Sequence, residues 1–223
     1  GVILGYAELL KENIGQEDIK KINYCDQILH AGDNAKKLTS KLLQFSRNDI
    51  ASSEVTDLNG LLKDMQHMLA KTLTARIHLN IEIEENLPFV LLDKSRLEDA
   101  ILNMCINSMH AIKENGSLTI KTKSLNISHV NQHYSDIPAG EYILLSIADT
   151  GTGMSEEIQS QIFDPFFTTK KDVGTGLGMS QVYGFVKQSN GYIDVFSREG
   201  EGTEISIYLP KHAIIKNDKV DKE

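Results

Sequence analysis

The sequence is short of cysteine, of long hydrophobic runs and of basic residues, and each shortage excludes a class of protein. Cys25 and Cys105 are its two cysteines, and both fall in apolar helical patterns, so we expect reduced, buried thiols in a cytoplasmic protein. No run reaches the roughly 18 apolar residues of a membrane span, and we expect no direct membrane contact from this part of the protein. The net charge of −8 argues against nucleic-acid binding.

The residues that are present are typical of globular domains. With 223 residues, 40% of them hydrophobic and 24% charged, the chain can form one large domain or two smaller ones. It begins at Gly1 inside a helical pattern and without a methionine. We therefore expect a fragment of a longer protein.

The first part of the chain, residues 1–49, is predicted to be a helical hairpin. Apolar residues follow helical spacing over 1–13 and 18–47, and a polar break at 13–16 separates the two patterns. Two amphipathic helices with a short connector form an antiparallel pair. Since one hairpin cannot bury both apolar stripes, we expect a homodimeric four-helix bundle. The alternative is that the hairpin packs on its own second domain. A polar linker at 47–53 follows.

Residues 50–212 switch repeatedly between helical and strand periodicity, which predicts an α+β chain whose second domain is an α/β sandwich. We expect a mixed, mostly antiparallel sheet with helices on one face. The charged tail, residues 213–223, is expected to fray. Strands are predicted at 54–56, 76–82, 89–92, 117–127, 141–149, 191–197 and 203–210, and helices at 57–73, 94–114, 155–162 and 176–188.

Two glycine-rich turns suggest a nucleotide pocket. Asp-Thr-Gly-Thr-Gly at 149–153 ends an apolar strand, and Gly-Thr-Gly-Leu-Gly at 174–178 opens a helix. Asp149 would be a buried acceptor that needs a donor, and the amino group of adenine is one, whereas guanine presents a carbonyl oxygen. The helix N-terminus suits phosphate oxygens. The hypothesis is therefore an ATP site. The alternatives are a plain strand-exit turn and an ordinary helix lead-in.

The predicted helix 94–114 carries polar residues on one face of an otherwise apolar pattern. Asn103, Asn107 and His110 share that face at positions i, i+4 and i+7. Buried asparagines need partners. One possibility is an internal polar network between helix and sheet. The other is an amide oxygen that coordinates Mg²⁺, with His110 as a donor to phosphate.

Taken in order, these motifs resemble the ATP-binding domain of sensor histidine kinases of two-component systems, in particular the nitrogen-regulator-like subfamily. The Asn-x-x-x-Asn helix and the two glycine turns look like the asparagine and glycine boxes, and Phe-Asp-Pro-Phe-Phe-Thr-Thr-Lys at 163–170 looks like the phenylalanine box. Residues 200–205 resemble the terminal strand of that domain, and residues 38–47 resemble the second helix of the kinase dimerisation hairpin. The resemblance implies the Bergerat-type ATP-binding fold and a lid at 154–173 that closes over ATP.

The resemblance also implies roles for single residues. Asn107 matches the Mg²⁺ ligand and Asn103 its companion, while Asp149 matches the adenine-binding carboxylate and Thr203 its supporting threonine. Asn103, His110 and Lys170 are the catalytic candidates. The residues implied to contact the nucleotide are Asn103, Asn107, His110, Asp149, Gly151, Gly153, Met154, Lys170, Gly174, Thr175, Gly176, Leu177, Gly178, Met179 and Thr203.

A kinase of this family transfers the γ-phosphoryl group of ATP to a histidine and then to an aspartate of a response-regulator receiver domain. The acceptor histidine is followed by an acidic residue, and none of the seven histidines here has one. We expect the acceptor about two helical turns before Gly1, and a dimer weakened by the loss of those turns. The whole protein would be cytoplasmic or the cytoplasmic part of a membrane-bound sensor.

Two competing functions use the same pocket. ATPases of the gyrase, chaperone and mismatch-repair type place a glutamate, which activates water, where this chain has Asn103. Asparagine cannot accept that proton, so Asn103 favours phosphoryl transfer over hydrolysis. The third possibility is a non-catalytic scaffold that is controlled by nucleotide.

Overall fold

The computed structural model describes residues 2–14, 18–29, 32, 53–128, 137–169 and 175–212. The chain separates into two compact units, Gly1–Ile50 and Ala51–Glu223. Within the described parts of the chain, no helix is long and apolar enough to cross a bilayer. The later part of the second hairpin helix, the tail 213–223 and the site residues Lys170 and Gly174 lie outside the described residues.

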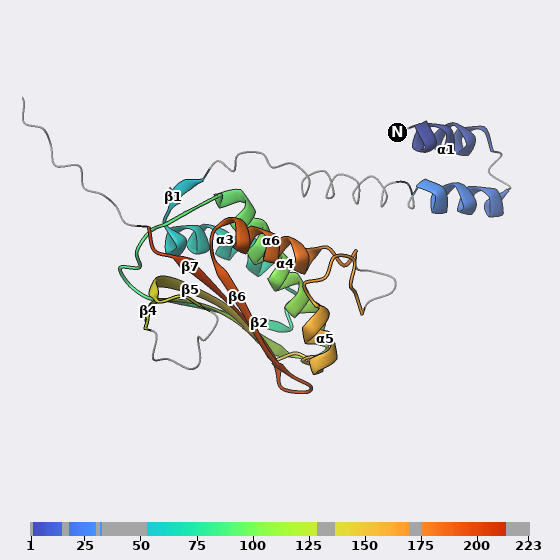
Figure 1. Cartoon of the computed structure of the whole chain (residues 1–223). Coiled ribbons are helices and arrows are strands. Elements are labelled where there is room, and N and C mark those ends of the chain that lie inside the picture. The colour runs from blue at the N-terminus through green and yellow to red at the C-terminus, as the bar shows by residue number, and fades with distance from the viewer. Residues whose placement is uncertain are drawn as a thin grey trace, which may run out of the picture. The chain divides into compact units, whose positions relative to one another are not determined.

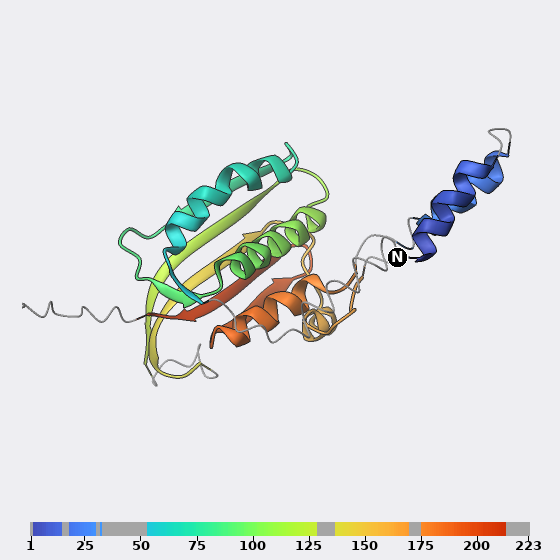
Figure 2. The same cartoon turned by 90° about the horizontal axis from the view of Figure 1, so that it is seen from above.

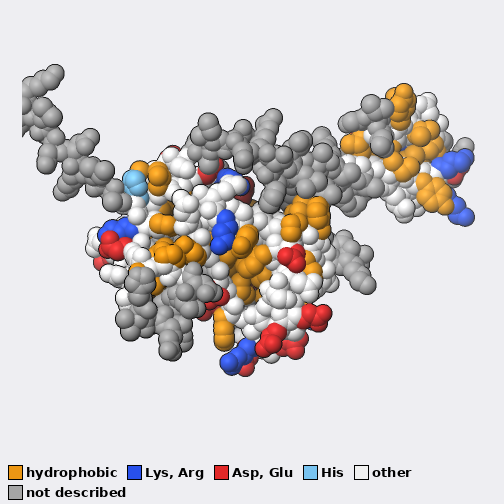
Figure 3. Space-filling view, in the orientation of Figure 1, with side chains coloured by type: hydrophobic (Ala, Val, Ile, Leu, Met, Phe, Trp, Pro, Cys, Tyr) orange, Lys and Arg blue, Asp and Glu red, His pale blue; other side chains and the backbone are white. Residues whose placement is uncertain are grey.

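The first unit contains two antiparallel helical segments, α1 (Val2–Asn13) and residues 19–29. The Lys11 ammonium lies 2.7 Å from the Asp26 carboxylate, and a Cβ added to Gly32 would lie 2.6 Å from Leu4 Cδ2. Early residues of one segment thus meet late residues of the other, as in the predicted hairpin. Figure 3 shows hydrophobic side chains on the outside of this unit; its exposed apolar residues are Tyr6, Leu9, Leu10, Ile19, Tyr24 and Ile28.

A five-stranded sheet is the centre of the second unit (Figure 1). Strands β2 (Ile77–Ile83) and β4 (Gly116–Ile127) are parallel, and every other neighbouring pair in this sheet is antiparallel. A separate antiparallel pair is formed by β1 (Glu54–Thr56) and β3 (Val90–Leu92). The order in the large sheet is β2 (Ile77–Ile83), β4 (Gly116–Ile127), β5 (Gly140–Asp149), β7 (Gly202–Pro210) and β6 (Tyr192–Arg198).

Three helices cover one face of this sheet, which is clearest from above (Figure 2). They are α3 (Leu58–Thr72), α4 (Lys94–Ala111) and α6 (Gly178–Gln188), and a short fourth helix, α5 (Glu156–Gln161), lies beyond the end of β5. The helices and strands share one hydrophobic core. The predicted fold class, a helical hairpin followed by an α/β sandwich with helices on one face, is confirmed.

Side-chain alternation along β5 places the site. Ile143, Leu145 and Ile147 are buried in the core between sheet and helices. Successive residues of a strand point to opposite faces, so Asp149 lies on the same side as these three, facing the helices. The buried carboxylate expected from the sequence is therefore at the end of the central strand, beneath α4.

In the second unit, two helix boundaries differ by more than one residue from the sequence-based expectation. Helix α4 ends at Ala111 instead of residue 114, because Ile112 is extended, with ψ 104°, and buries its side chain in the core. Helix α6 begins at Gly178 instead of residue 176. Gly176 has φ +66°, a left-handed conformation that a right-handed helix cannot contain.

Candidate functional site

Asp149 is a buried carboxylate with a hydrogen bond on each oxygen. Its exposed fraction is 9%. The Ser108 hydroxyl of α4 donates to Asp149 Oδ2 over 2.7 Å, and the Gly151 N–H donates to Oδ1 over 2.8 Å. A carboxylate has about four lone-pair positions, so acceptor capacity remains for a ligand that presents a donor.

The pKa of Asp149 reflects this environment. Burial raises the pKa of the carboxyl above its ordinary value, while the Ser108 hydroxyl and the backbone N–H groups of Gly151 and Thr203 act in the opposite direction. Hydrogen bonds to a charged form favour that form. A further donor from a ligand would therefore stabilise the ionised carboxylate.

The turn after Asp149 is fixed by close backbone packing. A Cβ added to Gly153, which has φ +63°, would collide with the Arg198 carbonyl oxygen, and one added to Gly202, with φ +105°, would collide with the Asp149 carbonyl oxygen. The Thr152 N–H donates to the Ala111 carbonyl over 3.1 Å. The turn is thus held between the end of α4 and the β6–β7 turn, where only glycine fits at these two positions.

A hydroxyl pair supports the site from the sheet. Thr203 lies directly opposite Asp149 in the β5–β7 register, and its hydroxyl oxygen is 2.8 Å from Ser197 Oγ on β6. Ser197 Oγ also accepts a 2.9 Å hydrogen bond from the Met154 N–H. The predicted residues Met154 and Thr203 are therefore joined through Ser197, which the sequence analysis did not identify.

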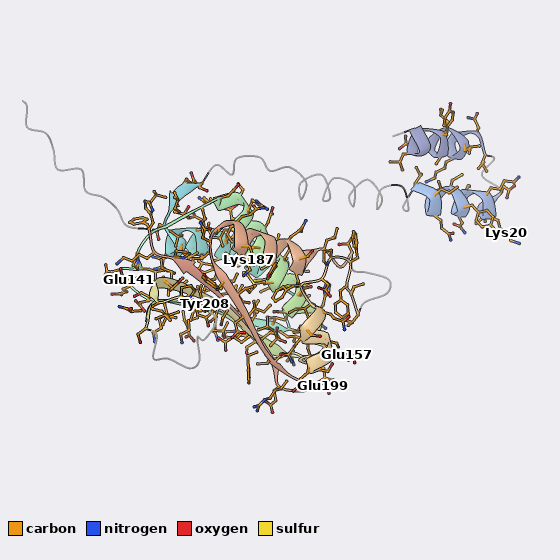
Figure 4. All side chains as sticks on the ribbon, in the orientation of Figure 1. Lys20, Glu141, Glu157, Lys187, Glu199 and Tyr208 are labelled. Carbon is orange, nitrogen blue, oxygen red and sulfur yellow. The ribbon has the colours of Figure 1, made fainter. Side chains whose placement is uncertain are left out.

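Helix α5 is held to strand β6 by a hydrogen bond. Gln159 Nε2 donates to the carbonyl oxygens of Met154, over 3.1 Å, and Ser197, over 3.0 Å. Figure 4 labels Glu157 on α5 and Glu199 in the turn after β6, at the same end of the domain. The first helix of the predicted lid is thus anchored beside Asp149.

The N-terminus of α6 lies next to the asparagine helix. Leu177 precedes α6 and caps it without a side-chain hydrogen bond, so backbone donors remain for a ligand. A Cβ added to Gly178 would lie 3.4 Å from Asn103 Oδ1. The structure therefore brings Asn103 to the glycine turn that the sequence assigned to phosphate.

The segment before α6 is shaped by Phe166 and Gly176. The Phe166 N–H donates to the Gly176 carbonyl over 3.0 Å, and Phe166 has φ 68° and a side chain that is 53% exposed. Phe163 packs on Tyr183 of α6, with ring centroids 5.3 Å apart. Phe163 is therefore packed against α6, whereas the Phe166 side chain is more than half exposed.

The remaining predicted residues differ in exposure. Asn103 and Asn107 are partly buried, whereas His110, one turn further along α4, is exposed. Within the described part of the chain, the side-chain amides of Asn103 and Asn107 make no hydrogen bond to another protein group. The internal polar network considered as an alternative is not formed by them, although Ser108 on the same helix does bond to the sheet.

Comparison with known proteins identifies the family. Residues 92–213 match the family described as histidine kinase-, DNA gyrase B- and HSP90-like ATPase. The sensor kinase CckA of Brucella abortus is 36% identical over 191 residues, which cover 85% of this chain and 20% of the relative. The sensor histidine kinase ZraS of Escherichia coli K12 is 28% identical over 179 residues, 80% of this chain and 35% of the relative.

The chain belongs to this ATPase family, and the two relatives named above are sensor kinases. It spans about a fifth to a third of the length of these two relatives. Full-length ShkA, solved in complex with AMPPNP, has a TM-score of 0.69 and 25% identity, covering 94% of this chain and 42% of that one. The histidine kinase ThkA, solved with the response regulator TrrA, shares the fold, with a TM-score of 0.65, 21% identity and coverage of 95% and 57%.

Three residues of this candidate site were missed by the sequence analysis. Ser108 had a detectable signal, because it continues the buried stripe Leu97, Ile101 and Met104 of α4, where a hydroxyl needs a partner. Ser197 and Gln159 had none, since their roles depend on the approach of β6 to α5.

Proposed function

We propose that this chain is the ATP-binding catalytic part of a sensor histidine kinase and that it transfers the γ-phosphoryl group of ATP to a histidine. Asp149 carries the proposal: it is a buried carboxylate whose oxygens already accept donors from Ser108 and Gly151 and can accept one more. Adenine offers that donor in its amino group, whereas guanine would set a carbonyl oxygen against the carboxylate.

The rest of the nucleotide extends toward α6. The uncapped N-terminus of α6 offers N–H groups and a positive dipole end to the phosphates. Gly176, Leu177 and Gly178 line this end, and Asn103 lies beside Gly178. The predicted contact of Thr175 belongs to the same end, and those of His110 and Met179 to the helices beside it. Lys170 and Gly174, also predicted to contact the nucleotide, lie outside the described residues.

Mg²⁺ would be held by Asn107 together with phosphate oxygens and water. The described residues contain no group of three or more acidic, histidine or cysteine side chains that could hold a metal by themselves. A site with one amide oxygen suits Mg²⁺, which takes few protein ligands when phosphates are present. Bound there, the ion would neutralise charge on the phosphates.

Asn103 favours transfer to a protein side chain over hydrolysis. Near Gly178 it offers an amide, which cannot remove a proton from water as a carboxylate does. In the transfer, the bond from the γ-phosphorus to the bridging oxygen breaks and a bond to a histidine ring nitrogen forms, with loss of the ring proton. Transfer onward to a response-regulator aspartate, and homodimerisation through the hairpin, are parts of the same proposal.

Replacement of Asp149 tests the site. Asp149→Asn places an amide where the carboxylate accepts from adenine, and we expect ATP affinity with Mg²⁺ to fall by roughly 1.5–3 kcal/mol, the worth of a hydrogen bond to a charged group. Calorimetry on the 223-residue chain measures this. Unchanged affinity in Asp149→Asn would remove Asp149 from the pocket.

The reaction is tested separately in the full-length protein. We expect γ-labelled ATP to give an acid-labile, base-stable label on histidine, with slow steady-state hydrolysis. Fast hydrolysis without a protein label would favour the gyrase-type ATPase, and binding with neither reaction would favour a nucleotide-controlled scaffold.

A further inference from the structure

Ser108 holds one oxygen of the proposed adenine-recognising carboxylate. Its side chain is 4% exposed, and its hydroxyl donates over 2.7 Å to Asp149 Oδ2, while the Gly151 N–H holds Oδ1. The two donors come from different places, α4 and the turn after β5. Two bonds on two oxygens fix the plane of a carboxylate, which a single bond would leave free to rotate.

We propose that Ser108 is a positioning and specificity-determining residue, whose hydroxyl orients the Asp149 carboxylate and keeps it an acceptor for the amino group of adenine. This inference rests on the proposed ATP site. Ser108 directly follows Asn107, the proposed Mg²⁺ ligand. One helix therefore links the adenine end of the pocket to its phosphate end.

Purine choice follows from the protonation state of Asp149. As an ionised acceptor, the carboxylate repels the carbonyl oxygen of guanine; as a protonated acid, it could donate to that oxygen. Burial favours the protonated form, and the Ser108 hydroxyl opposes it. Loss of the hydroxyl would thus weaken ATP binding and reduce discrimination against GTP together.

Few groups besides Asp149 itself can make ATP binding at this site depend on pH. Burial raises the pKa of Asp149, and hydrogen bonds from Ser108, Gly151 and Thr203 lower it. No charged side chain contributes to the shift of this pKa. His110 on α4 and Glu204 on β7, the nearest ionisable residues along those two elements, are exposed. On β4, the residue opposite Asp149 is the apolar Leu118.

The experiment compares Ser108→Ala with the wild-type chain by calorimetry with ATP and GTP over a series of pH values from acid to neutral, because burial raises the pKa of the Asp149 carboxyl. We expect ATP affinity at neutral pH to fall roughly 3- to 10-fold, the equivalent of one ordinary hydrogen bond. We also expect a smaller ATP-to-GTP affinity ratio and a higher pH midpoint for the loss of ATP binding. Ser108→Cys, with similar volume and a weaker donor, should be intermediate, and serves if Ser108→Ala does not fold.

Ser146→Ala is the matched control. Ser146 is a buried serine, 3% exposed, on the same strand as Asp149, but strand alternation puts it on the opposite face of the sheet. Its loss should leave the ATP-to-GTP ratio and the pH midpoint unchanged. A Ser108→Ala protein that keeps both wild-type values, even if it melts at a lower temperature, would show a structural role alone and overturn the inference.

The comparison with Asp149→Asn separates this inference from the proposed function. Weaker ATP binding in Asp149→Asn with wild-type behaviour in Ser108→Ala refutes only the role of Ser108. Failure of the wild-type chain to bind ATP, or equal binding by wild type and Asp149→Asn, refutes the pocket and this inference with it.

Discussion

Asp149 and Cys105 are both buried ionisable residues, but their surroundings differ. Asp149 is surrounded by donors, which oppose the effect of burial on its pKa. For Cys105 on α4 burial acts alone and raises the pKa of the thiol to about 12. The neutral thiol is thus the native form at ordinary pH. Burial of the neutral Cys105 thiol contributes fully to the stability of the folded state below the unfolded-state pKa of the thiol. This contribution is lost as the pH rises toward about 12.

Cys105 should be inert in the folded protein. In a Cys25→Ser chain, we expect a thiol reagent at about pH 8 to react far more slowly with native than with urea-unfolded protein, because only the exposed thiolate is nucleophilic. The absorbance of the chromophore that the reagent releases on reaction measures the rate. Equal rates in the two states would contradict the buried position of Cys105.

At the scale of elements, the β6–β7 turn decides the shape of the site. Gly200 in the turn has φ +82°, and Gly202, the first residue of β7, has φ +105°. A Cβ on Gly200 would meet nothing within 4 Å, whereas one on Gly202 would collide with the backbone of Asp149. The two positions thus separate the cost of a left-handed conformation from the cost of steric overlap.

Alanine substitutions at these glycines should differ in effect. Gly200→Ala should lower the free energy of unfolding by about 1–2 kcal/mol, the cost of left-handed backbone for an L-residue. Gly202→Ala should cost more and also weaken ATP binding, because β5 must move away at Asp149. Urea titrations and calorimetry on both variants make the test. Equal effects of the two substitutions would show that the close packing at Gly202 is unimportant.

At the scale of the whole molecule, the first unit leaves apolar residues uncovered. Ala7 and Cys25 are buried, while Tyr6, Leu9 and Leu10 of α1 are more than half exposed. Positions 6, 9 and 10 share one helix face by their i, i+3 and i+4 spacing. A second copy of the hairpin would cover this face in the proposed four-helix bundle.

The bundle is tested by charge at that face. We expect Leu9→Glu to weaken self-association, because the carboxylate would lose its hydration in the interface. The matched control is Leu91→Glu, an equally apolar and 48% exposed residue on β3, which should not change it. Sedimentation equilibrium measures both. A Leu9→Glu chain that associates as well as the wild type would place the dimer contact elsewhere.

Local signals were sufficient for most elements of the fold. Asp57 and Asp93 accept hydrogen bonds from the first turns of α3 and α4, alternation identified β4, and a run of apolar residues identified β5. The start of α6 was predicted too early because the left-handed conformation of Gly176 is set by its contact with Phe166, ten residues away.

The sequence by itself determined the elements, the two glycine turns and the place of Asp149 at the end of a buried strand, because capping, periodicity and turn chemistry act between residues close along the chain. Only the tertiary structure decided what surrounds that carboxylate. Ser108 and Thr203 lie far from Asp149 in sequence and reach it through the packing of α4 and β7 on β5. A hydrogen bond depends on distances within about 3 Å, which helix–sheet packing sets and which no local pattern encodes.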